Sequence, residues 1–152
     1  MEFLADIHPK IIHFPIAFLM LYPFMELVFL FSGKDFFSKS AMIFLAIGVI
    51  GSFFAALSGN QAFEVVENWN GEGKEIFSYH QLFANLTVWF FSALLIVRYI
   101  LFIKKKLNRT IISVIFVLSL IGVYLVYQTG NYGGKLSDNV IMNSTSSIED
   151  KK

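Results

Sequence analysis

Four long apolar runs constrain the fold of this chain more than any other feature. They lie at residues 11–31, 41–57, 82–103 and 111–127. Each is close to the ~20 residues that a helix needs to cross the ~30 Å hydrocarbon core of a bilayer. None has the alternating pattern of a barrel strand, and lipid requires every backbone polar group to be paired within the protein. The runs therefore predict an all-α membrane protein with four transmembrane helices.

Composition supports this class. Of the 152 residues, 56% are hydrophobic, which is more than a soluble domain of this size usually contains. Polar connections separate the runs, so we expect an up-down bundle. We place the helices at about 9–32, 40–67, 76–104 and 109–128. Residues 1–136 then form one transmembrane domain, and residues 137–152 form a polar, flexible tail.

Charged side chains predict the orientation of the bundle. The cations of the first and third connections are Lys34, Lys39, Lys104, Lys105, Lys106 and Arg109. The second connection and its flanks instead carry acidic residues such as Glu64, Glu72 and Glu75. Because loops rich in Lys and Arg stay in the cytoplasm, the pattern predicts periplasmic N- and C-termini in a bacterial inner (cytoplasmic) membrane.

The chain contains no cysteine. This excludes disulfides, thiolate metal ligands and covalently attached c-type haem, so any haem must be bound non-covalently. The formal net charge of +1 gives no reason to expect a nucleic-acid partner. The expected surroundings are the lipid bilayer and other membrane subunits.

All three histidines, His8, His13 and His80, lie at the predicted periplasmic end of the bundle. Pro9 suits the first turn of a helix, which puts His13 about one turn inside the first span. Pro15 lies further inside and predicts a bend in that span. His80 lies at the start of the third span.

His13 and His80 can meet across the bundle. In an up-down bundle the first and third helices are diagonal, with axes ~13 Å apart when adjacent axes are ~9 Å apart. Two imidazoles that each reach roughly 6 Å from Cα to a shared metal just span this distance. Ala17 and Ala84, four residues after each histidine on the same face, leave room beside the rings. The pair therefore predicts the axial ligands of one b-type haem near the outer surface.

The role of His8 stays open at this point. It could bond a haem propionate, bind a second metal or lie exposed at the membrane interface. Three histidines at one end also permit a copper or zinc site, because neutral imidazole suits both metals.

A stripe of small residues runs along the end of the second span, with Gly51, Ala55 and Gly59 spaced by four. Small residues let helices approach closely, so the stripe predicts a contact groove between helices. The edge of a haem could rest in the same groove. The stripe alone does not discriminate between these interpretations.

Two further polar features lie in the apolar runs or beside them. Glu26 is inside the first span, and an ionisable group there predicts a role in proton movement or quinone contact unless it reaches the interface. The stretch TGNYGGKL after the fourth span predicts a tight turn that folds back over the helix ends, and such a turn could also form a lid on a cofactor.

Several stretches resemble one bacterial family. HPKIIHFPIAF is similar to the opening of the small membrane proteins grouped as domain of unknown function 2231, whose first helix begins HPxxVHFPIA. AALSGNQAFE, YHQLFANL and GNYGGKL resemble later parts of the pattern, so the resemblance covers about residues 8–136. It implies four transmembrane helices, family histidines at positions 8, 13 and 80, and frequent association with c-type cytochromes. The chain departs from the family at Ser137 and Asp138, where Val-Tyr is common.

The leading hypothesis is a membrane electron-transfer protein with b-type haem. It would be a subunit of, or partner to, a respiratory or photosynthetic complex and would exchange electrons with a periplasmic c-type cytochrome or quinone. The alternatives are a haem-free accessory subunit of a larger complex and a copper or zinc protein. No catalytic triad, nucleotide motif or paired acids are visible, so an independent enzymatic activity has little support. The residues that would complete a haem site around His13 and His80 are His8, Ala17, Gly51, Ala55, Gly59 and Ala84.

Overall fold

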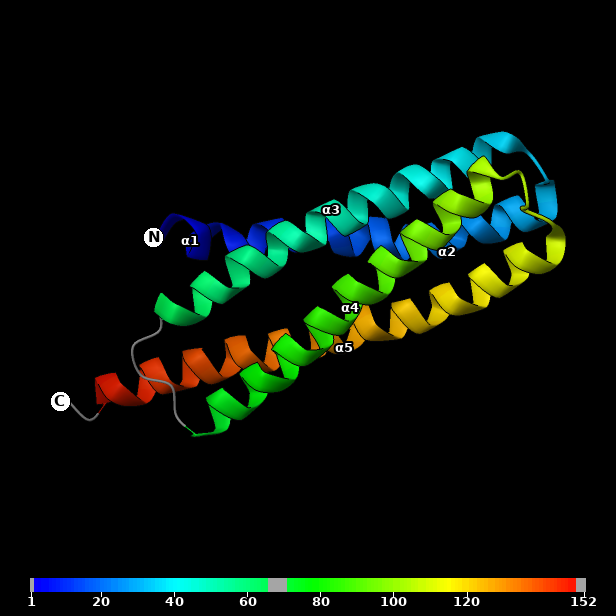
Figure 1. Ribbon diagram of the computed structural model, residues 1–152. Coiled ribbons are helices and arrows are strands. Elements are labelled where there is room, and N and C mark those ends of the chain that lie inside the picture. Colours follow the sequence, from blue (N-terminus) through cyan, green and yellow to red (C-terminus); the bar gives the residue numbers. More distant parts are fainter. Residues whose placement is uncertain (1, 66–70, 150–152) are drawn as a thin grey trace.

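A computed structural model describes the backbone of residues 2–65 and 71–149, and the side chains of residues 7–64 and 71–139. This part of the chain consists of helices joined by short connections, without a strand (Figure 1). The helices are α1 (Glu2–Ile11), α2 (His13–Ser32), α3 (Asp35–Val65), α4 (Gly71–Ile103) and α5 (Arg109–Glu149). The predicted all-α class is confirmed.

Four segments are long and apolar enough to cross a membrane. They are Ile7–Ser32, Asp35–Glu64, Gly71–Ile103 and Arg109–Asn139. Large apolar side chains are exposed along the outside of the bundle, for example Phe54, Trp89 and Ile96. An apolar exterior of this extent is suited to lipid rather than to water. The four predicted spans are confirmed.

The first span is divided into α1 and α2 by a break at Ile12. Pro15 is the cause, because it has no N–H for the carbonyl of Ile11 and its ring crowds that carbonyl. Two backbone hydrogen bonds still connect the residues on either side of the break. The N–H of Ile12 donates to the His8 carbonyl at 3.2 Å, and the N–H of Ile16 donates to the Ile12 carbonyl at 3.3 Å.

Two short connections, between α2 and α3 and between α4 and α5, reverse the direction of the chain at the end of the bundle opposite the N-terminus. Gly33 follows α2 with φ 63°, and its N–H donates to the Phe29 carbonyl at 2.9 Å. This left-handed conformation suits glycine and ends the helix. Asn108 caps α5, because its Oδ1 accepts a hydrogen bond from the N–H of Ile111 at 2.8 Å. The connections define a first hairpin, formed by α1, α2 and α3, and a second hairpin, formed by α4 and α5.

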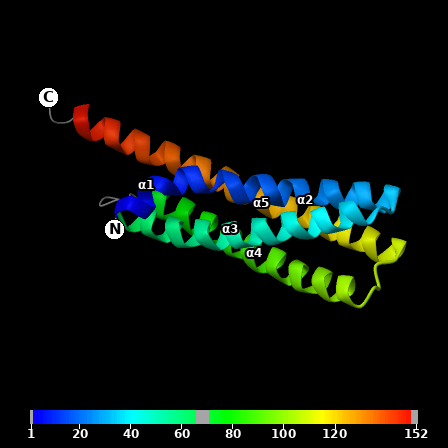
Figure 2. The same cartoon turned by 90° about the horizontal axis from the view of Figure 1, so that it is seen from above.

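The two hairpins pack side by side as an up-down bundle (Figures 1 and 2). α2 and α4 each pack against both α3 and α5, so α2 and α4 lie on a diagonal, and α1 packs mainly on α3. The start of α1, the end of α3, the start of α4 and the end of α5 share one end of the bundle. We call it the histidine end, since it carries His8, His13 and His80. The opposite end, with Lys34 and residues 104–106, is the lysine end.

Large side chains and close glycine contacts fill the centre of the bundle. The most deeply buried apolar residues are Leu19, Tyr22, Leu45, Phe91 and Ile115. Glycines on the facing helices provide the space that these side chains occupy. A Cβ on Gly48 would lie 2.5 Å from the Leu19 side chain, and one on Gly122 would lie 2.3 Å from the Phe91 ring.

The structure corrects the expected end of the fourth span. α5 continues past residue 128 to Glu149, so the tight turn expected at TGNYGGKL is wrong. Each glycine there costs up to about 1 kcal/mol of helix propensity relative to Ala. Contacts with α4 offset this cost, because the Tyr132 ring stacks on Tyr79 at 5.3 Å and on Phe83 at 5.5 Å. Tertiary packing therefore overrides local propensity.

The remaining helix limits also differ from those expected. The first helical segment begins at Glu2, α3 begins at Asp35 and α4 begins at Gly71, all earlier than the apolar runs indicate. Residues 137–149 of the expected tail belong to α5, whereas the predicted end of the second helix at residue 67 lies outside the described residues. Hydropathy locates the lipid-facing part of a helix, and the helices of this bundle extend beyond it.

Candidate functional site

His80 is held by the second hairpin through its ring atom Nδ1. This atom lies 3.0 Å from the carbonyl oxygen of Thr129 in α5. A carbonyl can only accept, so Nδ1 of His80 carries the proton and donates. The lone pair of the neutral ring is then on Nε2. The hydrogen bond thus fixes the tautomer of His80 as well as its orientation.

His8 is held by the first hairpin in the same way. Its Nδ1 lies 2.8 Å from Oγ of Ser58 in α3. The Ser58 hydroxyl donates its one proton to the Ala55 carbonyl at 3.0 Å, so toward His8 it can only accept. Nδ1 of His8 is therefore the donor, and its lone pair is also on Nε2.

A glycine of the neighbouring helix lies against each of these rings. A Cβ on Gly59 would lie 2.9 Å from Cε1 of His8, and one on Gly133 would lie 3.3 Å from Cε1 of His80. Both distances are shorter than ordinary van der Waals contact. The position of each imidazole therefore depends on the absence of a side chain at these two places.

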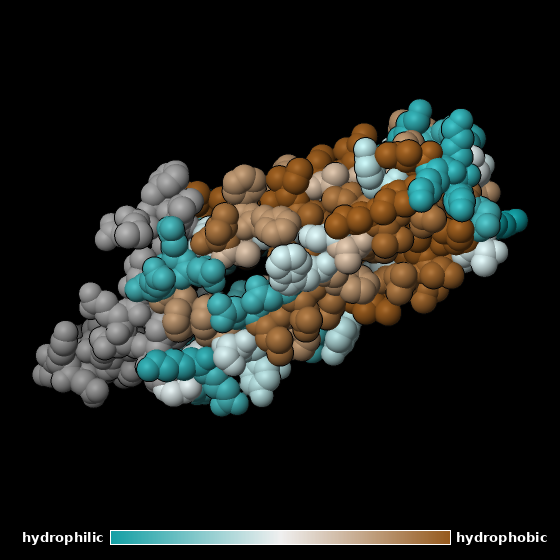
Figure 3. Space-filling model, in the orientation of Figure 1, coloured by the Kyte–Doolittle hydropathy of each residue, from teal (hydrophilic) through white to brown (hydrophobic). Residues whose placement is uncertain are grey.

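The two imidazoles lie on opposite sides of the interface between the hairpins. They are close enough for a charge on one ring to act on the other. Among the described residues, Nε2 of neither ring has a hydrogen-bond partner. α1 makes no backbone contact with α4 or α5 within the described chain, whereas α3 and α4 join the hairpins at this end through the stacked rings of Phe63 and Phe77, whose centres are 3.5 Å apart. Figure 3 shows a hollow between the two sides of the bundle toward the histidine end.

His13 has a different environment. Its side chain is exposed on α2, as is that of Ala17 one turn later, whereas Ala84 on α4 is half-buried. The histidine close enough to His80 for a charge on one ring to act on the other is His8. No hydrogen bond or ion pair joins His13 to His80 among the described residues.

The small-residue stripe of α3 packs against the first span. A Cβ on Gly51 would lie 3.2 Å from Pro15, and Gly59 contacts the His8 ring. Ala55 is half-buried between them. The stripe therefore forms a helix contact, and its role at the edge of a haem stays a prediction.

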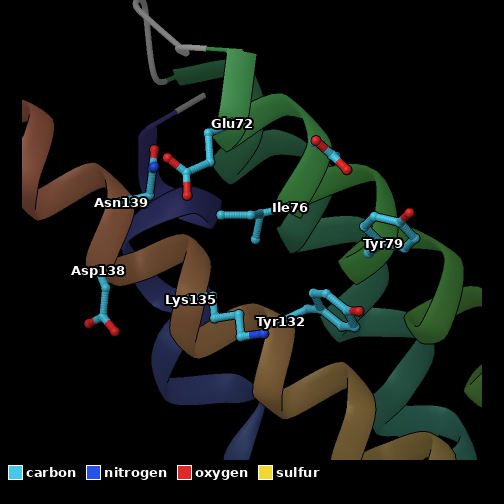
Figure 4. A pocket seen from close by; sticks show the side chains of 8 residues that line it. Glu72, Ile76, Tyr79, Tyr132, Lys135, Asp138 and Asn139 are labelled. Carbon is cyan, nitrogen blue, oxygen red and sulfur yellow. The ribbon is translucent and has the colours of Figure 1, made fainter.

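An open groove of about 500 Å³ lies between α4 and α5 near the histidine end (Figure 4). It is lined by Glu72, Glu75, Ile76, Tyr79, Tyr132, Lys135, Asp138 and Asn139. The Lys135 ammonium lies 5.1 Å from the centre of the Tyr132 ring, a cation–π contact. No histidine lines this groove, so it is a surface feature beside the histidine pair rather than part of it.

The two hairpins repeat one pattern in their first membrane-spanning helix. His80 follows His8 by 72 positions, and Arg98 follows Glu26 by the same number. Buried positions of α2 correspond to buried positions of α4 at this separation: Pro15 to Thr87, Leu19 to Phe91 and Tyr22 to Leu94.

The second helix of each hairpin repeats a motif of its own. Gly-x6-[Ser/Thr]-Gly-Asn is present as GSFFAALSGN at 51–60 and as GVYLVYQTGN at 122–131. The hydroxyl residue of each motif, Ser58 or Thr129, is the residue that holds the histidine of its own hairpin. Both hairpins start at the histidine end, so a pseudo-two-fold axis along the bundle relates them. Equivalent residues can then face each other across this axis.

Glu26 and Arg98 form such a facing pair. Nε of Arg98 donates to Oε1 of Glu26 at 2.6 Å, and both side chains are 0% exposed. Nη2 of Arg98 donates to Oγ of Ser38 at 3.0 Å, and its guanidinium carbon lies 5.8 Å from the centre of the Phe29 ring. The contact joins the diagonal helices α2 and α4. An ion pair buried in this way needs both partners, because a lone buried charge is strongly destabilising.

Sequence reasoning identified Glu26 and the histidines but missed their partners. Ser58, Thr129 and Arg98 are far from their partners in sequence, and no pattern within a single helix links them to those partners. The repeated Gly-x6-[Ser/Thr]-Gly-Asn pattern is the signal for Ser58 and Thr129. The separation of 72 residues, shared by His8 with His80 and Glu26 with Arg98, is the signal for Arg98.

The comparison with protein families agrees with the helical bundle. Residues 5–144 match the model of domain of unknown function 2231 (DUF2231), described as a predicted membrane protein. No curated protein and no solved structure matches the chain. The match covers nearly the whole chain, and it confirms the resemblance carried by HPKIIHFPIAF. With its four apolar helices and this match, the chain belongs to the DUF2231 family of membrane proteins.

Proposed function

We propose that this protein binds one b-type haem at the histidine end and transfers electrons through it, with His8 and His80 as the axial ligands. The observation that carries the proposal is that the two imidazoles have the same hydrogen-bonding arrangement. Each donates from Nδ1 to a neighbouring helix, so each has its lone pair on Nε2. Metal-binding histidines are typically oriented by such an acceptor at the other ring nitrogen.

Two imidazoles suit haem better than a bare metal ion. A haem brings four nitrogen ligands of its own and takes its axial ligands from the protein. Zinc takes three or four ligands from the protein. Among the described side chains, no group of three or more His, Cys, Asp or Glu residues is arranged to hold a metal ion. This comparison favours haem over the copper or zinc alternative.

The residues of the chain would hold and orient the cofactor, which itself supplies one-electron chemistry when bound. Ser58 and Thr129 would fix the ring tautomers, and Gly59 and Gly133 would let the rings lie close to the helix backbones. The hollow between the two sides of the bundle at this end (Figure 3) favours a planar ligand there. The exposure of His13 supports His8 as the partner of His80, and the sequence-based pair of His13 and His80 stays a prediction that the same experiment tests.

The proposed setting is a bacterial inner membrane, with the histidine end in the periplasm. The concentration of cations at the lysine end supports this orientation. The electron partner would be a periplasmic c-type cytochrome, quinone or another subunit of a respiratory or photosynthetic complex. The acidic side chains of the groove, Glu72, Glu75 and Asp138, would favour a partner with a basic surface.

Haem content of three alanine variants tests the ligand assignment. The wild-type protein and the His8→Ala, His80→Ala and His13→Ala variants are expressed with added haem, purified, and measured by absorption spectroscopy for haem per chain. We expect His8→Ala and His80→Ala to lose the low-spin b-type spectrum and His13→Ala to keep it. Loss in His13→Ala with an unchanged His8→Ala would assign His13 instead. An unchanged spectrum in all three variants would overturn ligation by histidine.

A further inference from the structure

The Glu26–Arg98 pair belongs to a polar cluster that the haem proposal does not use. Ser38 joins the cluster through Arg98, and the charges of Glu26 and Arg98 both act on the Tyr22 hydroxyl. The exposed fraction is 0% for Tyr22, Glu26 and Arg98, and 2% for Ser38. The four side chains come from α2, α3 and α4. They therefore form a polar contact between the hairpins inside the core.

Three polar atoms of this cluster lack a hydrogen bond of good geometry among the described residues, and the Tyr22 hydroxyl lies close to both Glu26 and Arg98. The three atoms are Oη of Tyr22, Oε2 of Glu26 and Nη1 of Arg98. The atoms complement each other, because Nη1 can only donate, Oε2 of the carboxylate can only accept and a hydroxyl can do both. Buried polar atoms are nearly always paired with protein or with ordered water. The cluster thus has the donors and acceptors of a small binding site.

We infer that one internal water molecule binds between Tyr22, Glu26 and Arg98. The water would accept a hydrogen bond from Nη1 of Arg98 and donate one to Oε2 of Glu26. Its third bond would be to the Tyr22 hydroxyl, and three bonds are typical of buried water. A cation at this place would be repelled by Arg98, and an anion would be repelled by Glu26. The chemistry therefore selects a small neutral ligand that can both donate and accept.

The lysine end is the nearer source of this water. Arg98 lies five residues before the end of α4 at Ile103, and Ser38 lies three residues after the start of α3 at Asp35. At 1.5 Å per residue, these positions are about 8 Å and about 5 Å from the helix ends. The water site is thus at the opposite end from the proposed haem, and either proposal can fail without the other.

Radiolytic hydroxyl-radical footprinting of the full chain in lipid nanodiscs tests the inference. Radicals form from water and modify the side chains beside it, which mass spectrometry then identifies. Tyr22 and Phe91 are matched, because both are aromatic and 0% exposed, and Phe91 packs in the apolar core. Tyr79, which is 43% exposed and lines the open groove near the histidine end, gives the level for an accessible ring. We expect several-fold more modification of Tyr22 than of Phe91, and equal, low modification of both would overturn the inference.

Two variants test whether the radicals that modify Tyr22 come from the bound water or reach the ring by another route. Ser38→Ala keeps all three unpaired atoms, so modification of Tyr22 should stay high. The double variant Glu26→Leu with Arg98→Leu removes both charged partners, so modification should fall to the level of Phe91. High modification that persists in the double variant would overturn the water site. If the double variant does not fold, the wild type and Ser38→Ala still decide the question through the ratio of Tyr22 to Phe91.

Discussion

Two glycines determine where the imidazoles of His8 and His80 can lie. A Cβ at position 59 would meet Cε1 of His8 at 2.9 Å, and one at position 133 would meet Cε1 of His80 at 3.3 Å. We expect Gly59→Ala to displace the His8 ring and to weaken haem binding, with a smaller effect for Gly133→Ala. Overpacking costs about 1–3 kcal/mol, so haem affinity should fall by about tenfold in Gly59→Ala.

Titration of the apoprotein with haem, followed by absorbance, measures this effect. Gly134→Ala is the matched control, because a Cβ there would have no neighbour within 4 Å. An unchanged haem affinity in Gly59→Ala, or an equal loss in Gly134→Ala, would contradict the proposed position of His8.

In the buried Glu26–Arg98 pair, each charge offsets the cost of burying the other. We expect Arg98→Ala to lower the free energy of unfolding by about 3–5 kcal/mol, because the Glu26 carboxylate would remain buried without its partner. Replacing both residues by Leu should restore much of this loss, since neither charge then remains in the core. Thermal unfolding in detergent measures both effects. The control is Arg109→Ala, which removes an exposed cation at the start of α5. Equal destabilisation by the single and double variants would contradict the mechanism.

The sequence predicted only half of this pair. Glu26 is conspicuous because it follows a long apolar run. Arg98 lies in LLIVRYILF, where one cation among eight apolar residues changes the mean hydropathy little. Which residue faces Glu26 depends on the packing of two diagonal helices, and spacing within a single helix contains no information on that packing. The pair becomes recognisable only when the two hairpins are compared.

At the scale of the helices, Pro15 interrupts the backbone hydrogen bonding between α1, which carries His8, and α2. Pro15→Ala restores an N–H for the carbonyl of Ile11, so we expect α1 and α2 to fuse into one helix. Hydrogen–deuterium exchange should then show a protected amide at position 15. Haem affinity should fall because His8 moves away from Ser58, while the free energy of unfolding stays the same or rises.

Pro23→Ala is the control for this prediction, because Pro23 lies inside α2 and far from His8. It should leave haem affinity unchanged. Unchanged haem affinity in Pro15→Ala, despite a protected amide at position 15, would contradict the link between the helix break and the histidine site.

The helices differ in how far the sequence could predict them. The four apolar runs located the spans, since lipid leaves little alternative to a helix at such length and hydropathy. The continuation of α5 through Gly130, Gly133 and Gly134 could not be predicted from propensity, which favours a turn. It depends on the stacking of Tyr132 against α4 and on the contact between Gly133 and His80. These are tertiary contacts between residues about fifty positions apart in the chain.

At the scale of the whole molecule, the two hairpins share one sequence pattern. Their equivalent residues form two pairs along the pseudo-two-fold axis, His8 with His80 and Glu26 with Arg98. The histidine pair lies at one end, and the charged pair lies toward the other end. The sequence predicted that the ligand pair lies at the histidine end and joins the first and third spans across the diagonal. It predicted His13 as the partner of His80, whereas the geometry favours His8. The spacing explains the difference, because side chains five positions apart on a helix, such as His8 and His13, point to different faces.

The orientation of the bundle predicts which end is accessible from outside the cell. Because the chain has no cysteine, single cysteines can report accessibility without a background. We expect a membrane-impermeant maleimide to label Glu75→Cys in intact cells, and to label Lys104→Cys only after the membrane is permeabilised. Both positions are exposed in the structure. The opposite labelling pattern would reverse the orientation and place the histidine end in the cytoplasm.

The reduced-minus-oxidised difference spectrum of the purified wild-type protein, with pyridine haemochrome analysis, tests the central claim most directly. Expression with added haem ensures that cofactor supply does not limit the result. The account predicts the sharp bands of a six-coordinate b-type haem, at about one haem per chain. A folded, helical protein that shows no haem band under these conditions would contradict it.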